Sequence, residues 1–156
     1  MGASTAVPRT EVRRMRKKID DYVSGRIPPP PIVTALGITM IRAADGTAEF
    51  GYVADGRHAN PMGTLHGGIL CDLADAAMGV ALASTLDEGE SFATLELHIN
   101  FLRPVWDAKL TAKGRIVSRG RTVAMTACDI VDEDQRHIAA VTGTQMILTG
   151  QMAKGR

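Results

Sequence analysis

A chain of 156 residues with 45% hydrophobic and 22% charged residues is typical of a single globular domain. Asp72 and Asp75 interrupt the most apolar stretch, so that no run reaches the roughly 20 apolar residues of a membrane helix. A net charge of +1 gives no reason to expect a nucleic-acid partner. Cys71 and Cys128 form no disulfide or zinc pattern, and the chain start lacks an apolar signal core, so that we expect the cytoplasm.

The first 26 residues carry seven basic and three acidic side chains, and the basic ones concentrate in the run RRMRKK. Apolar residues recur at helical spacing after Thr10, which fits an N-cap; they are Val12, Met15, Ile19, Tyr22 and Val23. This pattern predicts an amphipathic helix of about three turns, docked on the body with its charges in solvent. Attraction of an anionic ligand or a membrane surface is the alternative.

The segment IPPPPI at residues 27–32 predicts a semi-rigid polyproline II spacer, because proline fixes φ and removes the donors that a helix needs. We expect a basic helix and proline-rich linker at residues 1–31, a main domain at residues 32–150, and a tail at residues 151–156. No internal repeat divides the main domain.

The main domain begins with two short strands around the turn Asp45-Gly46, within residues 37–55. A long apolar helix follows, from about Gly67 to Leu86. Four further strand-like segments cover residues 92–104, 109–119, 122–133 and 137–148. In the first of them an apolar set alternates with a polar set, which predicts one core-facing side; the sets are Leu95, Leu97, Ile99 and Phe101 against Thr94, Glu96, His98 and Asn100. The whole predicts an α+β fold in which five to six antiparallel strands cover one helix.

Two acids interrupt this helix, although its apolar residues predict burial on nearly every side. Asp72 lies near the N-terminal end, where the helix dipole favours a carboxylate. Asp75 lies a turn further on, and an unpaired buried carboxylate is costly or becomes protonated. We therefore interpret Asp75 as functional, with a solvent-facing or structural role as the alternative.

The segment His66-Gly67-Gly68 stands at the start of the same helix, where glycine is unfavourable unless bare backbone is needed. Unpaired N–H groups at a helix N-terminus carry the positive end of the dipole and suit a developing oxyanion. A tight corner in which only glycine fits is the alternative. The turn Asn60-Pro61 with Gly63 could present the Asn60 amide to the same place.

The spacing of Gly67 and Asp75 indicates a dimer. Eight residues separate them, or roughly 12 Å along a helix, so that one chain cannot hold a single carbonyl with both. Two copies of the helix that run antiparallel across a two-fold axis would bring Gly67 of one subunit to Asp75 of the other. The predicted active site is therefore shared and occurs twice.

The run HANPMGTLHGGILCDLADAAMG, with TLELHINFLRP downstream, resembles the hotdog-fold acyl-CoA thioesterases of the PaaI-like and human thioesterase superfamily member 2 type. The resemblance extends from about Gly37 to Leu148. It implies a hotdog fold, in which an antiparallel sheet wraps a long helix, and dimers that pair into tetramers. It implies an acyl-CoA thioesterase that needs no cofactor, because coenzyme A is part of the substrate.

The resemblance also implies roles for individual residues. Asp75 matches the catalytic carboxylate, which activates water or attacks the thioester directly. Gly67 matches the residue whose N–H polarises the thioester carbonyl, and Gly68 adjoins it as a substrate-binding residue. Asn60 and His66 match residues that orient the carbonyl, the water or the loop. Thr94 corresponds to a Ser or Thr near the water; it and Asp75 would come from one subunit, and Asn60, His66 and Gly67 from the other.

Basic residues are expected near the coenzyme A phosphates. Arg119 and Arg121, at a hairpin turn, resemble the family segment that approaches the nucleotide, although arginines at such a tip often serve solubility alone. Lys113, Arg103 and the basic N-terminal helix are further candidates. The acyl group is expected beside the long helix, near Leu70, Leu73, Met78 and the first hairpin. Aryl and fatty acyl groups remain equally compatible with the sequence.

Two other kinds of catalytic site are disfavoured. The four histidines, His58, His66, His98 and His137, show no zinc spacing, so that we expect no metal. Cys71 lies about 140° round the helix from His66, and a neighbouring carboxylate would raise its pKa, opposite to activation. A hotdog module that binds acyl-CoA without turnover and a 3-hydroxyacyl thioester dehydratase are the alternative functions. The first would not need Asp75, and the second needs a differently placed acid/base pair.

Overall fold

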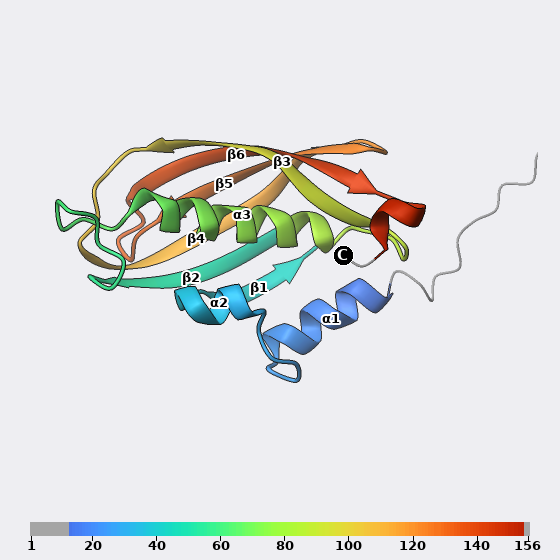
Figure 1. The fold of residues 1–156 in the computed structure, drawn as a ribbon, viewed down its shortest axis with the longest axis horizontal. Helices are drawn as coiled ribbons and strands as arrows, with labels where there is room; N and C mark the ends of the chain where they lie inside the picture. The colour runs from blue at the N-terminus through green and yellow to red at the C-terminus, as the bar shows by residue number, and fades with distance from the viewer. Residues whose placement is uncertain (1–12, 155–156) are drawn as a thin grey trace, which may run out of the picture.

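The computed structural model describes residues 13–154, which form a six-stranded antiparallel sheet with helices on one face (Figure 1). The strand order across the sheet is β1-β2-β4-β5-β6-β3. The strands are β1 Thr39–Ala44, β2 Thr47–Asp55, β3 Ser91–Phe101, β4 Asp107–Arg119, β5 Val123–Val131 and β6 His137–Leu148. Asp45 (φ 50°) and Gly46 (φ 81°) make the predicted first turn, since the tight hairpin needs two left-handed residues. The predicted α+β architecture is confirmed.

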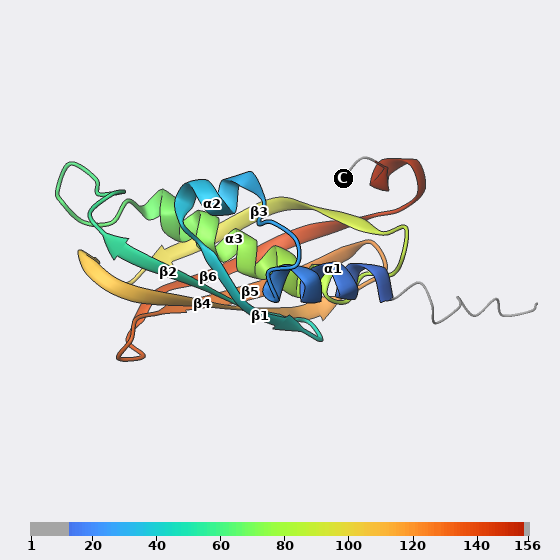
Figure 2. The same cartoon turned by 90° about the horizontal axis from the view of Figure 1, so that it is seen from below.

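The long helix α3, Gly67–Ala83, lies along the inner face of this sheet, as Figures 1 and 2 show from two directions. Its sheet-facing side chains are fully buried; among them are Leu73, Ala77, Met78 and Leu82. The helix ends at Ala83 rather than at the predicted Leu86. Beyond Ala83 the chain continues in tighter turns, because the N–H groups of Thr85 and Leu86 donate to carbonyls three residues back (2.9 and 3.3 Å).

A glycine in the sheet lets the helix come this close. A Cβ atom at Gly114 of β4 would lie 2.5 Å from the carbonyl carbon and oxygen of Ala77 in α3. The backbone of the helix therefore rests on a strand position without a side chain. This contact fixes the depth at which α3 lies against the sheet.

One stripe of α3 is not covered by the sheet. Asp72 is exposed, and Gly68, Cys71, Asp75 and Ala76 are partly exposed. These positions recur every three to four residues and so share one helix face. The expectation of burial on nearly every side is therefore wrong for the single chain. Asp72 also lies beyond the first turn, so that the dipole does not account for it.

A β-bulge in β3 decides which side chains of that strand face the helix. The register with β6 shifts between Thr94, which pairs with Gln145, and Glu96, which pairs with Thr144. The extra residue, Leu95, points away from the core and is 53% exposed. Thr94 thereby shares the helix-facing side with Leu97, in contrast to the predicted strict alternation.

The N-terminal helix α1, Arg13–Val23, packs against the first hairpin, as predicted for a docked amphipathic helix. Ile19 is buried, and Tyr22 packs against the main core. The expected N-cap Thr10 lies outside the described residues.

A second helix, α2, Pro31–Leu36, was not predicted. The predicted spacer ends earlier, because Pro31 begins this helix: a proline needs no intrahelical N–H partner in the first turn. Val33 of α2 is buried in the main core. In the tail, a short 3-10 helix, Gly150–Ala153, follows β6. No helix within residues 13–154 is long and apolar enough to cross a membrane.

Candidate active site

His66 is the N-cap of α3. Its backbone is extended (φ −64°, ψ 131°), and its ring Nδ1 accepts a hydrogen bond of 2.9 Å from the N–H of Gly68. His66 thus fills the role that Ser, Thr, Asp or Asn usually has at this position. Because Nδ1 is the acceptor, a neutral His66 carries its proton on Nε2. The predicted contribution of Gly68 to substrate binding would have to use a group other than this paired N–H.

Gly67 presents the free amide of this helix end. Its N–H makes no hydrogen bond within the described part of the chain, and it lies at the positive end of the α3 dipole. A Cβ atom at this position would lie 2.9 Å from the ring of Phe101. The structure therefore agrees with both interpretations of Gly67: there is little room for a side chain at this corner, and its N–H is free to donate.

Asn60 shapes the loop in front of the helix. Its side-chain oxygen accepts hydrogen bonds from the N–H groups of Met62 (2.9 Å) and Thr64 (3.2 Å), and its nitrogen donates to the hydroxyl of Thr64 (2.8 Å). The predicted turn closes when the N–H of Gly63 donates to the carbonyl of Asn60 (2.9 Å). One N–H of the Asn60 amide remains for a ligand.

Asn60 and Gly67 line a common groove of about 380 Å³ with Phe101. The other lining residues are Thr64, Leu65, Leu70, Leu102, Arg103, Pro104 and Val105. Arg103 is the only basic residue in this lining, and it donates to the carbonyl of His137 (2.7 Å). The predicted amide donor thus opens into a groove with a cationic group beside it.

Asp75 and Thr94 form the second half of the predicted site. The hydroxyl of Thr94 donates to Oδ1 of Asp75 over 2.8 Å, and both side chains are partly exposed. The bulge after Thr94 makes this contact possible, because it turns Thr94 toward the helix. Asp72 lies one turn before Asp75, and its pKa is raised by desolvation and by the charge of Asp75.

The two halves lie apart within the single chain. Asp75 is not among the residues that line the groove of Gly67. Both belong to α3, so that the roughly 12 Å expected from their spacing holds along one straight element. The structure therefore brings together Asn60, His66 and Gly67, and separately Asp75 and Thr94.

The predicted phosphate-binding arginines lie elsewhere. Arg119, at the end of β4, forms an ion pair of 2.8 Å with Glu90, which follows the C-terminal end of α3. Arg121 is exposed in the next turn. Lys113 donates to the side chain of Gln135 over 2.8 Å. None of these three lines the groove of Gly67.

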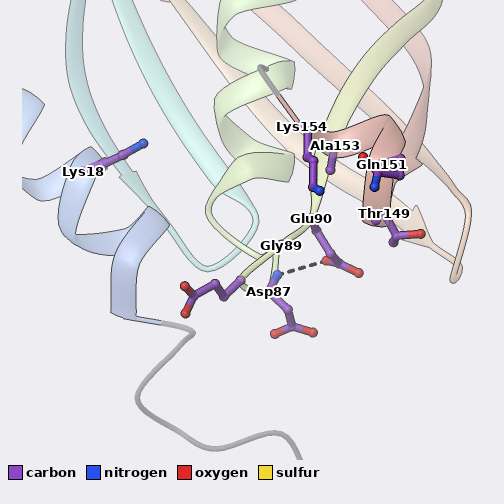
Figure 3. A pocket seen from close by; sticks show the side chains of 10 residues that line it. Lys18, Asp87, Gly89, Glu90, Thr149, Gln151, Ala153 and Lys154 are labelled. Carbon is purple, nitrogen blue, oxygen red and sulfur yellow. Dashed lines mark hydrogen bonds between the residues drawn. The ribbon is translucent and has the colours of Figure 1, made fainter.

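A recess of about 820 Å³, lined by several charged residues, opens beside this end of the molecule (Figure 3). Asp87, Glu88 and Glu90 contribute to it from the loop after α3, and Lys154 from the C-terminal segment. Figure 3 shows Lys18 of α1 apart from the other labelled side chains. The recess combines three acidic with two basic residues, so that it does not suit a phosphate group.

The cysteines and histidines carry no sign of a second catalytic centre. The pKa of Cys71 is raised by burial and by the charge of Asp72, which supports the prediction that it is not a nucleophile. Burial raises the pKa of Cys128 to about 12. Within residues 13–154, no three His, Cys, Asp or Glu residues gather in a way that could hold a metal ion.

Two features near Asp75 were missed from the sequence. Gln145 of β6 is fully buried opposite Thr94, whereas the sequence indicated only that residues 137–148 form a strand. An apolar groove of about 210 Å³ lies between α1, α2, the first hairpin and α3. The spacing of apolar residues in α1 predicted an apolar stripe on this helix. It did not predict which surface packs against the stripe, because that surface comes from segments that are distant in the sequence.

Known proteins with similar sequence and structure agree on one family. The profile of the Thioesterase superfamily matches residues 62–139. The medium/long-chain acyl-CoA thioesterase YigI of Salmonella typhimurium is 28% identical over 134 residues, covering 75% of this chain and 85% of that protein. Among solved structures, a Haemophilus influenzae thioesterase has a TM-score of 0.72 at 29% identity, with 76% and 82% of the two chains covered. The PaaI protein of the Escherichia coli phenylacetic acid degradation operon has a TM-score of 0.75 at 25% identity, with 87% and 97% covered.

The helix, its sheet and these likenesses define a hotdog-fold thioesterase. The chain belongs to the thioesterase superfamily, and its reaction is the hydrolysis of a thioester. The matched residues contain His66, Gly67, Asp75 and Thr94 of the predicted site, whereas Asn60 lies two residues before the match begins.

Proposed function

We propose that the protein hydrolyses an acyl-CoA thioester in an active site shared by two subunits. Asp75 and Thr94 come from one subunit, and Asn60, His66 and Gly67 come from the other. The observation that carries this proposal is that the Asp75–Thr94 pair lies on the uncovered stripe of α3, whereas the unpaired Gly67 amide lies at the N-terminal end of the same helix.

Two surfaces support pairing of the chains. The uncovered stripe of α3 includes the small residues Gly68, Cys71 and Ala76, which permit close approach of a second helix. Among the strands of residues 13–154, β3 is an edge strand whose one neighbour is β6, and a long unpaired edge is a template for another strand. Pairing of two β3 edges across a two-fold axis would lay the α3 helices antiparallel, as the shared site requires.

A dimer of dimers is the proposed larger assembly. Val117, Val123 and Met125 are exposed on the sheet, and their neighbour Ala124 is buried toward α3. Side chains alternate along a strand, so that Val123 and Met125 point to the outer face of the sheet. An exposed group of apolar residues of this kind favours contact with a second sheet.

The chemistry follows from the groups at the two helix ends. The Gly67 N–H donates to the thioester carbonyl, and the dipole of α3 stabilises the negative charge that develops on it, by about 3 kcal/mol. Asp75 either takes a proton from the attacking water or adds to the carbonyl itself. A positioned general base accelerates such a step about 10²- to 10⁴-fold. In both mechanisms the hydroxyl of Thr94 fixes the orientation of the carboxylate.

The acyl group is proposed to occupy the apolar groove. Its lining includes Tyr22, Met40, Ala76 and Val80, of which Ala76 directly follows Asp75. The expected Leu73 and Met78 face the sheet and are fully buried, so that they do not line it. An apolar cavity of about 150 Å³ binds benzene, so that about 210 Å³ suits one aromatic ring or a short alkyl segment. The comparison with YigI favours the alkyl chain.

The coenzyme A moiety is proposed to leave along the groove of Gly67. Arg103 lies in this groove and can meet a phosphate, whereas Arg119 and Arg121 are more distant candidates. The proposed reaction uses a carboxylate, water and an amide, so that it needs no cofactor or metal. The two unbonded cysteines fit the cytoplasm as the proposed location.

The decisive experiment is hydrolysis of a panel of acyl-CoA thioesters, followed by the release of free thiol. The variant Asp75→Asn should keep the fold and substrate binding while kcat falls about 10²- to 10⁴-fold, because the amide cannot accept the proton or attack. Circular dichroism and a binding measurement with a non-hydrolysable acyl-CoA serve as controls. Unchanged turnover in this variant would remove Asp75 from the mechanism.

A further inference from the structure

Gln145 of β6 is an exception among the buried polar residues. Ser84, Thr126 and Asp132 are buried as well, and each has a hydrogen-bond partner. Gln145 is fully buried, yet neither its side-chain oxygen nor its nitrogen has a partner within the described part of the chain. An unpaired buried amide destabilises a fold, and leucine or methionine would fill a similar space without that penalty.

The surroundings of Gln145 belong to the candidate active site. In the sheet it pairs with Thr94 on one side and Ala124 on the other. Side chains of directly opposed residues in an antiparallel pair have their Cβ atoms about 5 Å apart. Its nitrogen lies 4.0 Å from the Cβ position of Gly79, one turn of α3 beyond Asp75. The amide is therefore enclosed between Thr94 and the turn of α3 that follows Asp75.

We propose that Gln145 is a positioning residue that acts through Thr94. The Thr94 hydroxyl uses its one proton in the hydrogen bond that it donates to Asp75. Its oxygen has two lone pairs that can accept hydrogen bonds. In the proposed arrangement the Gln145 side chain rotates so that its amide donates to the Thr94 oxygen, which keeps the hydroxyl proton directed at Asp75. Gln145 thereby holds the carboxylate in its reactive orientation without touching the substrate. This inference rests on the proposed roles of Asp75 and Thr94.

The test combines kinetics with a double-mutant cycle. Gln145→Leu should lower kcat about three- to tenfold, the effect of losing one hydrogen bond, and leave KM unchanged. The melting temperature of this variant should rise, because the substitution also removes the side-chain oxygen of Gln145, which stays unpaired in the proposed arrangement. In the Thr94→Val background the same substitution should cause no further loss. Thr126→Val, a buried polar substitution in the neighbouring strand, should leave kcat at the wild-type value.

Gln145→Met is a second variant, with an unbranched side chain of similar length. Wild-type kcat in both Gln145 variants, or an equal loss with and without Thr94, would overturn the inference. Failure of both variants to fold would also contradict it, since the amide would then serve the fold. If Asp75→Asn is inactive while the Gln145 variants are fully active, only this inference fails. If Asp75→Asn is fully active, the proposed site fails and this inference with it.

Discussion

At the scale of single residues, the two ends of the candidate site are built differently. The Gly67 amide is available because His66 caps the neighbouring N–H of Gly68 and leaves the first one unpaired. Asp75 depends on a side chain from another element, the hydroxyl of Thr94. The exposed Gly67 amide is therefore produced by neighbouring residues in the sequence, whereas the Asp75–Thr94 pair is a contact between distant segments.

The role of the Gly67 amide can be tested with a matched pair of variants. Gly67→Pro removes the N–H donor, and kcat should fall about 10²- to 10³-fold if this donor stabilises the oxyanion. Gly67→Ala adds a Cβ atom against Phe101 but keeps the donor, and the exposed Phe101 ring can move. Gly67→Ala should therefore lose far less activity in the same thiol-release assay. Equal losses in the two variants would assign Gly67 to packing alone.

At the scale of elements, glycine and the bulge decide how helix and sheet fit together. Gly114 brings the backbone of α3 onto β4, and the bulge at Leu95 turns Thr94 toward Asp75. The packing of α1 and α2 against the first hairpin closes the apolar groove. The Asp75–Thr94 pair and the proposed acyl groove thus depend on contacts between elements that are distant in sequence.

Gly114→Ala should destabilise the protein by about 1–3 kcal/mol or more, because the new Cβ atom would meet helix backbone that cannot move aside. Gly51→Ala on β2 is the control, since its nearest contact is the side chain of Ile41 at an ordinary 3.4 Å. Thermal or denaturant unfolding of both variants gives the comparison. Equal stability of the two variants would show that the close approach at Gly114 does not constrain the fold.

The acyl groove can be narrowed from the helix side. Val80→Phe should fill part of the groove and shift the preference toward shorter acyl chains. Each methylene that loses its place in the groove should lower kcat/KM about fourfold, since its burial contributes about 0.8 kcal/mol. The measurement is kcat/KM across a series of acyl-CoA chain lengths. Val53→Phe on the exposed side of β2 is the control. An identical chain-length profile in the two variants would show that the acyl group does not bind in this groove.

At the scale of the whole molecule, the proposed site needs two chains. The groove of Gly67 and the Asp75–Thr94 pair are separate surfaces of one chain, and each exposes groups that the other lacks. Antiparallel α3 helices would join them twice, once on each side of the two-fold axis. The edge strand β3 gives such a pair a natural contact.

Mixed dimers test this arrangement directly. Asp75→Asn and Gly67→Pro should each be nearly inactive alone, and mixing the unfolded chains followed by refolding should restore activity. A mixed dimer places both defects in one site and leaves the other intact, so that random pairing should recover about one quarter of wild-type turnover. No recovery, although mixed dimers are shown to form, would mean that each site lies within one chain.

The sequence by itself determined the class of fold and the long helix, and it predicted the two candidate functional groups on that helix, the Gly67 amide and Asp75. The apolar periodicities, the His-Gly-Gly segment and Asp75 are local patterns, and they need no distant partner to be recognised. The eight-residue spacing of Gly67 and Asp75 was also enough to predict a shared site.

Only the tertiary structure decided which side chains meet. Strict alternation placed Thr94 on the outer side of its strand, and the bulge reversed this, because one extra residue shifts the phase of a strand. The helix α2, the uncovered stripe of α3, the ion pair of Arg119 and the burial of Gln145 all depend on elements that are far apart in the chain. Periodicity indicates that a residue faces a neighbour, but the packing of the whole chain decides which neighbour it is.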